Sequence, residues 1–408
     1  MLSEKTIGIV KSTAPVLEVK GKEITTHFYK TMFEAHPELL HIFNHANQQK
    51  GRQQTALANT VTAAAKYIDQ LEVLLPVVKQ IAHKHRSLAI KAEHYPIVGE
   101  FLLKAIKEVL GDAATEEILQ AWAEAYGAIA DIFIQVEKEM YEEAEQQKNG
   151  WKDFKPFRIV DKVKESQSIT SFYLAPADGQ GVPSFSPGQY VSLRINIDGE
   201  TYLQNRQYSL SDSPNEKMYR ISVKREDEGT PAGKVSNYLH ECEIGYEVEV
   251  SAPAGDFVLD FKNRKPAYLI SGGVGVTPLL SMLKTIVAND PEQEVTFIHA
   301  AKNSNVHAFG EEVKDSVALS NHARNYLLYS EPTSEDKRER KYDQEGYIDQ
   351  AFLESVVKEN DGQFYVCGPV PFIKAVVSEL KQLEVKTENI HYEFFGPAIN
   401  IEEPTPVQ

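Results

Sequence analysis

The spacing of apolar residues changes twice along this 408-residue chain, and this change limits the folds open to it more than any other feature. Up to about Gly150, apolar residues recur every three or four positions, as at Ile97, Phe101 and Ala105, and strand-like runs are nearly absent. Such spacing places apolar side chains on one face of a helix. The first stretch is therefore predicted to be an all-α domain.

Beyond the polar and then abruptly aromatic segment "EEAEQQKNGWKDF", apolar residues alternate with polar ones instead. Val191, Leu193 and Ile195 share one face of "QYVSLRINI", and "MYRISVKRE" repeats the pattern. Turn-forming clusters such as "DSPNEK" separate these runs. Short alternating strands with few helices are typical of a small antiparallel β-barrel.

From about Lys265, apolar strands alternate with helices. The expected strands include "AYLIS", "EVTFIHAA", "NYLLYS" and "QFYVC", and the expected helices include "LLSMLKTIV" and "PFIKAVVSELKQL". This alternation predicts an α/β domain with a parallel sheet. We therefore expect three domains, at residues 1–147, 152–262 and 263–408.

Charge and cysteine content narrow the range of functions. The formal net charge of -16 argues against nucleic-acid binding, because affinity for a phosphate backbone depends on Lys and Arg. The only two cysteines, Cys242 and Cys367, lie far apart, so we expect no disulfide framework, thiolate metal site or iron–sulfur cluster. The first residues lack the order of a signal peptide, and no apolar run is long enough for a membrane span. We expect a cytoplasmic protein.

The stretch "RQYSLS" ends a predicted barrel strand and combines three kinds of chemistry. Arg206 can pair with a phosphate, Tyr208 offers an aromatic face, and Ser209 offers a hydroxyl. Taken alone, this pattern is more often an ordinary barrel rim. Downstream, however, Gly233 to Ser236 opens a predicted helix whose free N–H groups form an anion site. The two elements together predict a phosphate-bearing flavin.

The stretch "SGGVGVTP" is a glycine turn between a strand and a helix, which suits close approach to a pyrophosphate. It departs from the dehydrogenase pattern, because Pro278 replaces the third glycine and "HAAKN" holds no acidic residue. In the order "RQYSLS", "SGGVGVTP", "CGPVPF", the motifs nevertheless resemble the ferredoxin–NADP reductase family, from about Trp151 to Gly396.

This resemblance implies that the barrel binds FAD and that the α/β domain binds NADH or NADPH. The residues implied or predicted to hold FAD are Tyr190, Arg206, Gln207, Tyr208, Ser209, Gly233, Lys234, Val235 and Ser236. Those implied to cradle the nicotinamide dinucleotide are Gly272, Gly273, Val274, Gly275, Val276 and Thr277, with Cys367, Gly368 and Pro369 near the nicotinamide. Those implied to stack on or close over the flavin are Phe394, Phe395, Gly396 and Pro397. For Cys367, a small buried strand residue is an equally good interpretation.

A flavin reductase needs an electron acceptor, which here is either a haem in the helical domain or an external partner. A haem needs an inward-facing imidazole. His83 and His85 lie two residues apart, about 200° around a helix, so both cannot face inward. Only His85 shares the apolar stripe of Val78 and Ile81, whereas His94 is expected in a surface loop. His85 is thus the better candidate, although a single histidine in such a place is more often structural than a ligand.

At this point the resemblance extends to almost the whole chain. "IAHKHRSLAIKAEHYPIVGEFLL" and "HIFNHANQQKGRQQTALA" resemble the proximal and distal regions of the flavohaemoglobins, in which a globin is fused to a flavin reductase. The resemblance implies that His85 is the axial ligand of haem b, with Tyr95 and Glu137 as its hydrogen-bond partners. Without it, a solvated carboxylate is the better interpretation of Glu137.

On the other side of the haem, the resemblance implies that Tyr29 and Gln53 are hydrogen-bonding groups for a bound ligand, although a Tyr in helical "HFYKTMF" is usually a core residue. Leu57 would be a steric wall, and Phe43 would pack on the porphyrin. Lys84 is a candidate for guiding electron transfer to the haem, although a surface lysine is the simpler interpretation. The tail "AINIEEPTPVQ" is expected to be disordered.

The function that the resemblance implies is that of a nitric oxide dioxygenase. NAD(P)H would reduce FAD, FAD would pass single electrons to the haem iron, and ferrous haem with O2 would convert NO to nitrate. Two alternatives stay open: a haem-based sensor or carrier of O2 or NO, and a flavin reductase acting on ferric chelates or hydroperoxides. We expect a monomer whose haem pocket is also a candidate site for a lipid or an azole.

Overall fold

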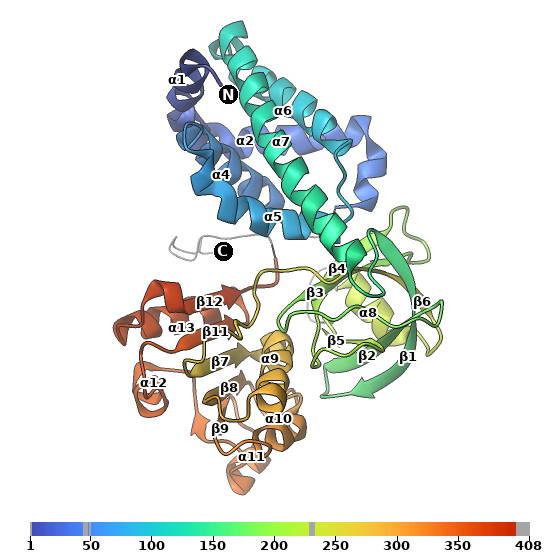
Figure 1. Ribbon diagram of the computed structural model, residues 1–408, viewed down its shortest axis with the longest axis vertical. Helices are drawn as coiled ribbons and strands as arrows, with labels where there is room; N and C mark the ends of the chain where they lie inside the picture. Colours follow the sequence, from blue (N-terminus) through green and yellow to red (C-terminus); the bar gives the residue numbers. More distant parts are fainter. Residues whose placement is uncertain (1, 44–47, 49, 228–232, 397–408) are drawn as a thin grey trace.

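The computed structural model describes residues 2–43, 48, 50–227 and 233–396. A helical domain lies at one end of the molecule, and a barrel and an α/β domain lie side by side beneath it (Figure 1). This confirms the predicted fold class and the order of its parts. The domain limits expected at 147/152 and 262/263 fall between elements, after α7 and after β6 respectively.

The helical domain is built from helices that pack against one another in several pairs. Its elements are α1 (Glu4–Ser12), α2 (Ala14–Ala35), η1 (Pro37–His41), α4 (Arg52–Lys66), η2 (Leu71–Leu74), α5 (Leu75–Ser87), α6 (His94–Leu110), η3 (Gly111–Ala113) and α7 (Glu116–Gln146). Helix α2 packs against α4 and α6, and α5 packs against α7. At the crossing of α2 and α4, a Cβ on Gly21 would lie 3.3 Å from Cβ of Ala58, so glycine allows the close approach. The prediction that His94 lies in a surface loop is wrong, because α6 begins at this residue and Pro96 fits its first turn.

The barrel is a six-stranded antiparallel sheet in the order β4-β3-β6-β1-β2-β5. Its elements are β1 (Phe154–Lys164), β2 (Ile169–Pro176), β3 (Tyr190–Ile195), β4 (Gln204–Ser209), β5 (Tyr219–Lys224), α8 (Lys234–Glu241) and β6 (Glu247–Ser251). An antiparallel bridge between Leu210 and Ile221 closes β4 onto β5. Helix α8 packs Val235 and Leu239 against the barrel core. The alternating apolar residues seen in the sequence therefore form the inward face of the barrel strands.

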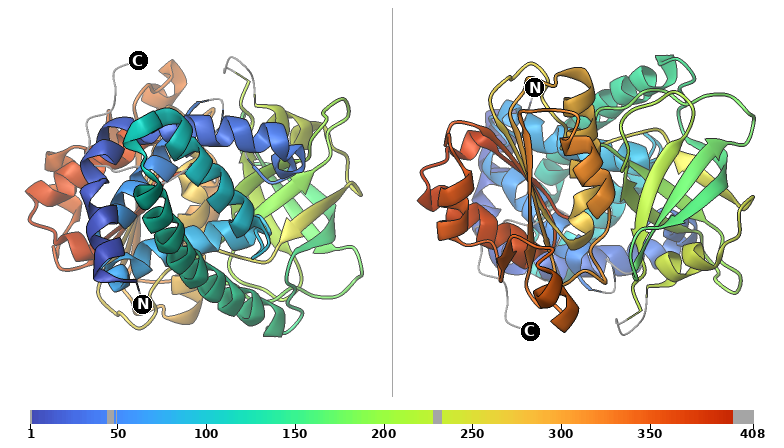
Figure 2. Two further views of the ribbon diagram at one scale, coloured as in Figure 1. Left: turned by 90° about the horizontal axis from the view of Figure 1, so that it is seen from above. Right: turned by 90° about the horizontal axis from the view of Figure 1, so that it is seen from below.

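The α/β domain is a six-stranded parallel sheet in the order β10-β9-β8-β7-β11-β12. Its elements are β7 (Ala267–Gly272), η4 (Gly273–Gly275), α9 (Val276–Asn289), β8 (Val295–Ala301), α10 (Gly310–Val317), β9 (Ala323–Tyr329), α11 (Ser334–Glu339), β10 (Gln344–Glu345), α12 (Gln350–Val356), β11 (Gln363–Cys367), α13 (Val370–Gln382), η5 (Thr387–Asn389) and β12 (Ile390–Glu393). Helices cover both faces of the sheet (Figure 2), α9 and α10 on one and α12 and α13 on the other. The strand order reverses between β7 and β11, which is where open sheets of this kind bind ligands.

Helix α5 and the end of α7 lie on the side of the helical domain that faces the other two domains (Figure 1). Within the described part of the chain, no helix combines the length and the apolar character needed to cross a membrane.

Candidate functional site

Three helices bring Tyr95 and Glu137 to the Nδ1 side of the His85 imidazole ring. The His85 Nδ1 atom lies 2.7 Å from Glu137 Oε1 and 3.2 Å from the Tyr95 hydroxyl oxygen. The Tyr95 hydroxyl donates to the same carboxylate oxygen at 2.6 Å. Glu137 is only 3 % exposed, so the solvated carboxylate suggested by the residues alone is wrong.

The chemistry of this group follows from its burial. A buried carboxylate is costly unless donors surround it, and here Nδ1–H of His85 and the Tyr95 hydroxyl fill that role. Burial, aided by the Glu137 charge, raises the pKa of Tyr95, so the phenol keeps the proton that it donates. Because Nδ1 of His85 donates to Glu137, the lone pair lies on Nε2, which makes no hydrogen bond to any described residue. An imidazole held in this way is prepared to bind a metal.

The other predicted haem-pocket residues lie on the α2 and α4 side of the domain. Tyr29 is buried on α2, and its ring lies 5.8 Å from that of Phe43. Burial raises the pKa of Tyr29, so its hydroxyl stays protonated, and it makes no hydrogen bond to a described residue. On α4, Gln53 has a buried Oε1 without a partner, and Leu57 follows one turn later, only partly buried. Buried polar groups without hydrogen-bond partners point to a ligand that supplies those partners.

These features fit an iron porphyrin. His85 offers one free ring nitrogen, Tyr29 and Gln53 offer two unpaired polar groups, and partly buried apolar side chains such as Phe43 and Leu57 complete the lining. The structure thus brings the predicted residues into one domain, in two groups. Their individual roles toward a haem stay predictions.

The predicted flavin-binding residues lie on β3, β4 and the start of α8. Strand pairing places Tyr190 opposite Ser209, so the aromatic ring and the hydroxyl are neighbours. Arg206 bonds only the Asn205 carbonyl oxygen, at 2.7 Å, among the described residues. The Tyr208 hydroxyl bonds none of them. A cation and a phenol left free in this way fit a phosphate and the ring system of a flavin.

The start of α8 lies beside the turn between β3 and β4, because Lys234 pairs with Glu200 at 2.6 Å. Gly233 precedes the helix, and the first-turn N–H groups of Lys234, Val235 and Ser236 have no helical acceptor. A Cβ at Gly233 would lie 2.6 Å from the Ser236 hydroxyl, so glycine is needed there. The start of α8 therefore lies near the loop that leads into β4, the strand that carries Arg206.

The motifs predicted to bind the nicotinamide dinucleotide meet at the carboxyl edge of the parallel sheet. Ser271 pairs with Cys367, and Cys367 pairs with Glu393. These pairings place three segments at one edge: Gly272 to Thr277, Cys367 to Pro369, and Phe394 to Gly396.

The glycines of the turn are required by its geometry. Gly273 has a φ of 54°, and a Cβ on Gly275 would collide with the Cys367 carbonyl. Cys367 itself is fully buried, and burial raises the pKa of its thiol well above the usual value. This favours simple packing over a direct chemical role. Pro397 and the tail predicted to be disordered lie outside the described residues.

The flavin strand β4 is bonded to the helical domain on two sides. Gln207 Nε2 donates at 3.0 Å to the Ser87 hydroxyl, two residues after His85. Asn205 Nδ2 donates to the carbonyl oxygens of His41 and Ile42, at 2.7 and 2.9 Å. Sequence reasoning missed Ser87 and Asn205. Small polar residues in such places look solvent-exposed in the sequence, and only the structure shows that they form hydrogen bonds between domains.

The surface interpretation of Lys84 is wrong. Its Nζ donates to the Gly396 carbonyl at 2.9 Å, so it links α5 to the segment after β12. Glu393 lies close to it, and burial raises the pKa of this carboxyl to about 7 although Lys84 opposes the shift. His83, the histidine that faces away from the apolar stripe, accepts a hydrogen bond from Gly255 N at 3.3 Å. Glu393 was also missed, because "IHYEFFG" offers no signal beyond its strand pattern.

Family models match all three parts of the chain. A globin model matches residues 26–133, an oxidoreductase FAD-binding domain matches residues 156–259, and an oxidoreductase NAD-binding domain matches residues 269–378.

Relatives match the chain along its length. A flavohaemoprotein of Bacillus thuringiensis subsp. konkukian is 58% identical over 404 residues, which is 98% of this chain and 100% of that protein. A crystal structure of a flavohaemoglobin from Malassezia yamatoensis, with bound FAD and haem, matches 97% of this chain and 100% of its own, with 28% identity and a TM-score of 0.86. The FAD/NAD-binding domain of a nitric oxide dioxygenase from Vibrio cholerae covers 60% of this chain and 99% of its own, with 36% identity and a TM-score of 0.54.

Proposed function

The chain belongs to the flavohaemoprotein family, and from this premise we propose that it is a nitric oxide dioxygenase, which uses NADH or NADPH and O2 to convert NO to nitrate. It is an oxidoreductase with a globin domain and a flavin reductase module. The observation that carries the proposal is the hydrogen bond of 2.7 Å between His85 Nδ1 and the buried carboxylate of Glu137.

The residues assigned above fit three cofactors. We place haem b with His85 as axial ligand, FAD against β4 and the start of α8, and the nicotinamide dinucleotide against the turn after β7. The nicotinamide supplies a hydride, the flavin divides its two electrons, and the haem iron takes them singly and binds O2.

The proximal residues favour oxygen activation over reversible storage. Glu137 accepts the Nδ1 proton of His85 and so draws the ring toward imidazolate, which increases electron donation from Nε2. Tyr95 donates to the same oxygen of Glu137 and keeps the carboxylate in place. A carrier of O2 needs no such buried charge, so this arrangement favours the dioxygenase over the carrier.

The distal residues offer hydrogen-bonding groups to a ligand and exclude water. The protonated hydroxyl of Tyr29 and the side chain of Gln53 are free to hydrogen-bond a small polar ligand. Leu57 and Phe43 surround that space with apolar surface, which strengthens such hydrogen bonds by keeping water away. The contact of Gln207 with Ser87 keeps the flavin strand against the helix that carries His85.

The proposal is tested with the purified chain loaded with haem and FAD. In aerated buffer with excess NADH, pulses of NO are followed with an electrode, and nitrate is measured afterwards. We expect rapid NO loss with one nitrate per NO, and one NADH consumed per pair of NO molecules, because each NADH carries two electrons. NADH oxidation that is slow and unaffected by NO would instead indicate a sensor or carrier.

A substitution of the proximal carboxylate gives a more specific prediction. Glu137→Gln should lower NO conversion about 10–100-fold, the usual cost of losing a carboxylate behind a metal-bound histidine. The iron–histidine stretching frequency in resonance Raman spectra should fall, because the imidazole becomes less basic. Haem content and flavin reduction by NADH should stay unchanged. Glu143→Gln, an exposed carboxylate on the same helix, is the matched control. Unchanged activity together with an unchanged frequency would contradict the role given to Glu137.

Several expectations from the sequence stay predictions here. These are the monomeric state, the cytoplasmic location and the binding of a lipid or an azole in the haem pocket.

A further inference from the structure

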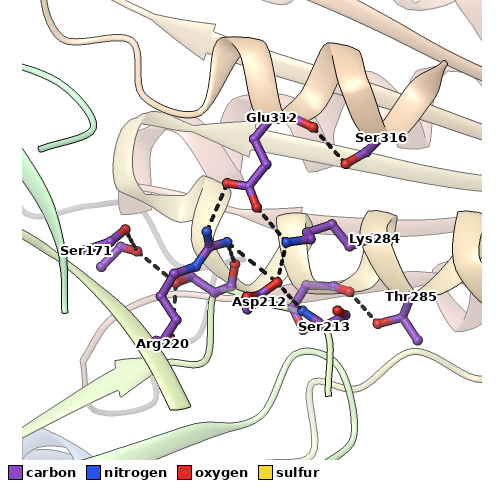
Figure 3. Close-up of polar contacts among 11 residues, drawn as sticks. Ser171, Asp212, Ser213, Arg220, Lys284, Thr285, Glu312 and Ser316 are labelled. Atoms are coloured by element: carbon purple, nitrogen blue, oxygen red, sulfur yellow. Dashed lines mark hydrogen bonds and ion pairs between the residues drawn. The ribbon is translucent and has the colours of Figure 1, made fainter. Parts of the chain in front are cut away.

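Four charged side chains meet where the barrel contacts the α/β domain (Figure 3). The barrel contributes Arg220 on β5 and Asp212, which follows β4. The α/β domain contributes Lys284 on α9 and Glu312 on α10. We call these four residues the charge ring.

Each cation of the charge ring contacts both anions. Arg220 Nη1 lies 2.9 Å from Glu312 Oε2, and Arg220 Nη2 lies 4.0 Å from Asp212 Oδ1. Lys284 Nζ lies 2.6 Å from Glu312 Oε1 and also pairs with Asp212. Both cations therefore bridge the two domains through one or the other anion, and the four charges sum to zero.

Burial separates the charge ring from the ordinary surface pairs of this protein. The Arg220 side chain is 4% exposed, and that of Glu312 is 26% exposed. By contrast, Lys314 and Glu311, a pair on α10, have exposures of 62% and 84%. Charges withdrawn from water are costly unless they are paired, so removing one member leaves the others uncompensated. Each of the four is thus needed to keep the charges at this contact compensated.

Arg220 makes further contacts with both domains. The Arg220 guanidinium also donates to the Ser211 carbonyl oxygen and lies 5.5 Å from the centroid of the Phe309 ring. The Ser211 hydroxyl bonds that of Ser222 at 2.7 Å, and Ser222 bonds Ser171 at 2.8 Å. Phe309, which precedes α10, has a φ of 64°, a conformation that a phenylalanine adopts only when its surroundings impose it.

The charges of the ring are maintained by one another. Burial by itself acts to lower the pKa of Arg220, but the hydrogen bond that Arg220 donates to Glu312 and the charge of Asp212 raise it overall. Burial acts to raise the pKa of Asp212, but Arg220 and Lys284 lower it overall. Both shifts favour the charged forms at neutral pH.

The charge ring lies a short distance along the chain from both cofactor motifs. Asp212 follows Ser209 of the flavin strand by three residues. Lys284 lies on α9, which begins directly after the glycine turn, and eight residues of helix span about 12 Å. The charge ring is therefore close along the chain to the flavin strand on the barrel side and to the nicotinamide turn on the other side.

We propose that the charge ring sets the position of the nicotinamide turn relative to the flavin strand, which makes its four members positioning residues for hydride transfer. This inference rests on the reductase half of the proposed function. In that step a C–H bond of NADH breaks and its hydrogen, with two electrons, bonds to the flavin, so that NADH becomes NAD+ and the flavin is reduced. A displacement of about 1 Å can cost such a reaction about a hundredfold in rate.

The test uses the full chain loaded with haem and FAD, as Lys284→Gln and as its matched control Lys314→Gln. Lys314→Gln removes a lysine from the same domain without touching the barrel. Flavin bleaching by NADH is followed anaerobically by stopped flow, without NO, so that the limiting rate and the Kd for NADH are obtained separately. We expect Lys284→Gln to lower the limiting rate about tenfold with little change in Kd, because geometry rather than binding is altered. Lys314→Gln should match the parent.

A second measurement reports the position of the domains directly. The two native cysteines are buried, so spin labels attach selectively to Lys217→Cys on the barrel and Glu354→Cys on α12. In the parent and in Lys314→Gln the distance distribution should be narrow, and in Lys284→Gln it should broaden. Asp212→Asn combined with Lys284→Gln should be no slower than the worse single variant, because the members act as a unit.

The possible failures are distinct from one another. If Lys284→Gln lowers the Tm but leaves the limiting rate and the distance distribution unchanged, the charge ring only stabilises the fold and the inference is wrong. If the parent flavin is not bleached by NADH at all, the proposed function fails instead.

Discussion

Replacing His85 with alanine is expected to remove haem from the protein while leaving NADH-dependent flavin reduction intact. The ring is held by Glu137 at 2.7 Å with Nε2 free. Among the described residues, the carboxylates paired with other histidines are exposed, whereas Glu137 is buried. The Soret band should disappear after haem supplementation. Nitrate formation should fall at least about a hundredfold, since the axial ligand itself is lost rather than a partner behind it. NADH should still bleach the flavin, because the barrel and the α/β domain are untouched.

His83→Ala is the control, since His83 is two residues away but contacts the barrel through Gly255. It should keep the Soret band and nitrate formation. If His85→Ala binds haem and forms nitrate at the parent rate, the assignment of the axial ligand is wrong, and with it the account of the helical domain.

Replacing Arg206 with alanine should have the opposite effect, losing the flavin while keeping the haem. A hydrogen bond between charged partners contributes about 1.5–3 kcal/mol, so the Kd for FAD should rise roughly 10–150-fold. The haem spectrum should be normal, but the iron should stay ferric in the presence of NADH when FAD is scarce. Excess FAD should restore reduction in part. Quenching of flavin fluorescence on titration measures the affinity directly.

Arg158→Ala controls for the loss of a positive charge on the barrel. Arg158 is exposed on β1 and pairs only with Glu247, at 3.3 Å, among the described residues. This variant should bind FAD like the parent. An Arg206→Ala protein with parent-like FAD affinity would show that the phosphate is held elsewhere.

Together these variants separate the chain into its electron source and its oxygen site, and the structure indicates why the two are on one chain. Strand β4 carries the flavin motif and also bonds the helical domain through Asn205 and Gln207. The contact with Ser87 lies two residues from His85. On the proposed assignment, a strand that serves both purposes would hold the flavin near the helical domain.

Much of the fold followed from local patterns. Apolar residues recur every three or four positions in the first domain and every two in the second, and predicted strands alternate with helices in the third. These patterns predicted the three domains in order, because the period of the side chains is a direct consequence of backbone geometry. The glycines of "SGGVGVTP" were informative for the same reason, since Gly273 has a positive φ and Gly275 faces the Cys367 carbonyl. Such constraints act between neighbours in the chain or on one element, so the sequence displays them.

What the sequence by itself determined is the set of elements, the candidate ligand His85 on an apolar stripe, and the two anion-binding turns. What only the tertiary structure decided is the environment of single polar groups. Glu137 and Lys84 look solvated in sequence, yet one is buried against His85 and the other bonds Gly396. The charge ring joins residues up to about a hundred positions apart, Arg220 and Glu312 among them. The cost of burying a charge depends on which groups surround it, and those groups come from distant parts of the chain.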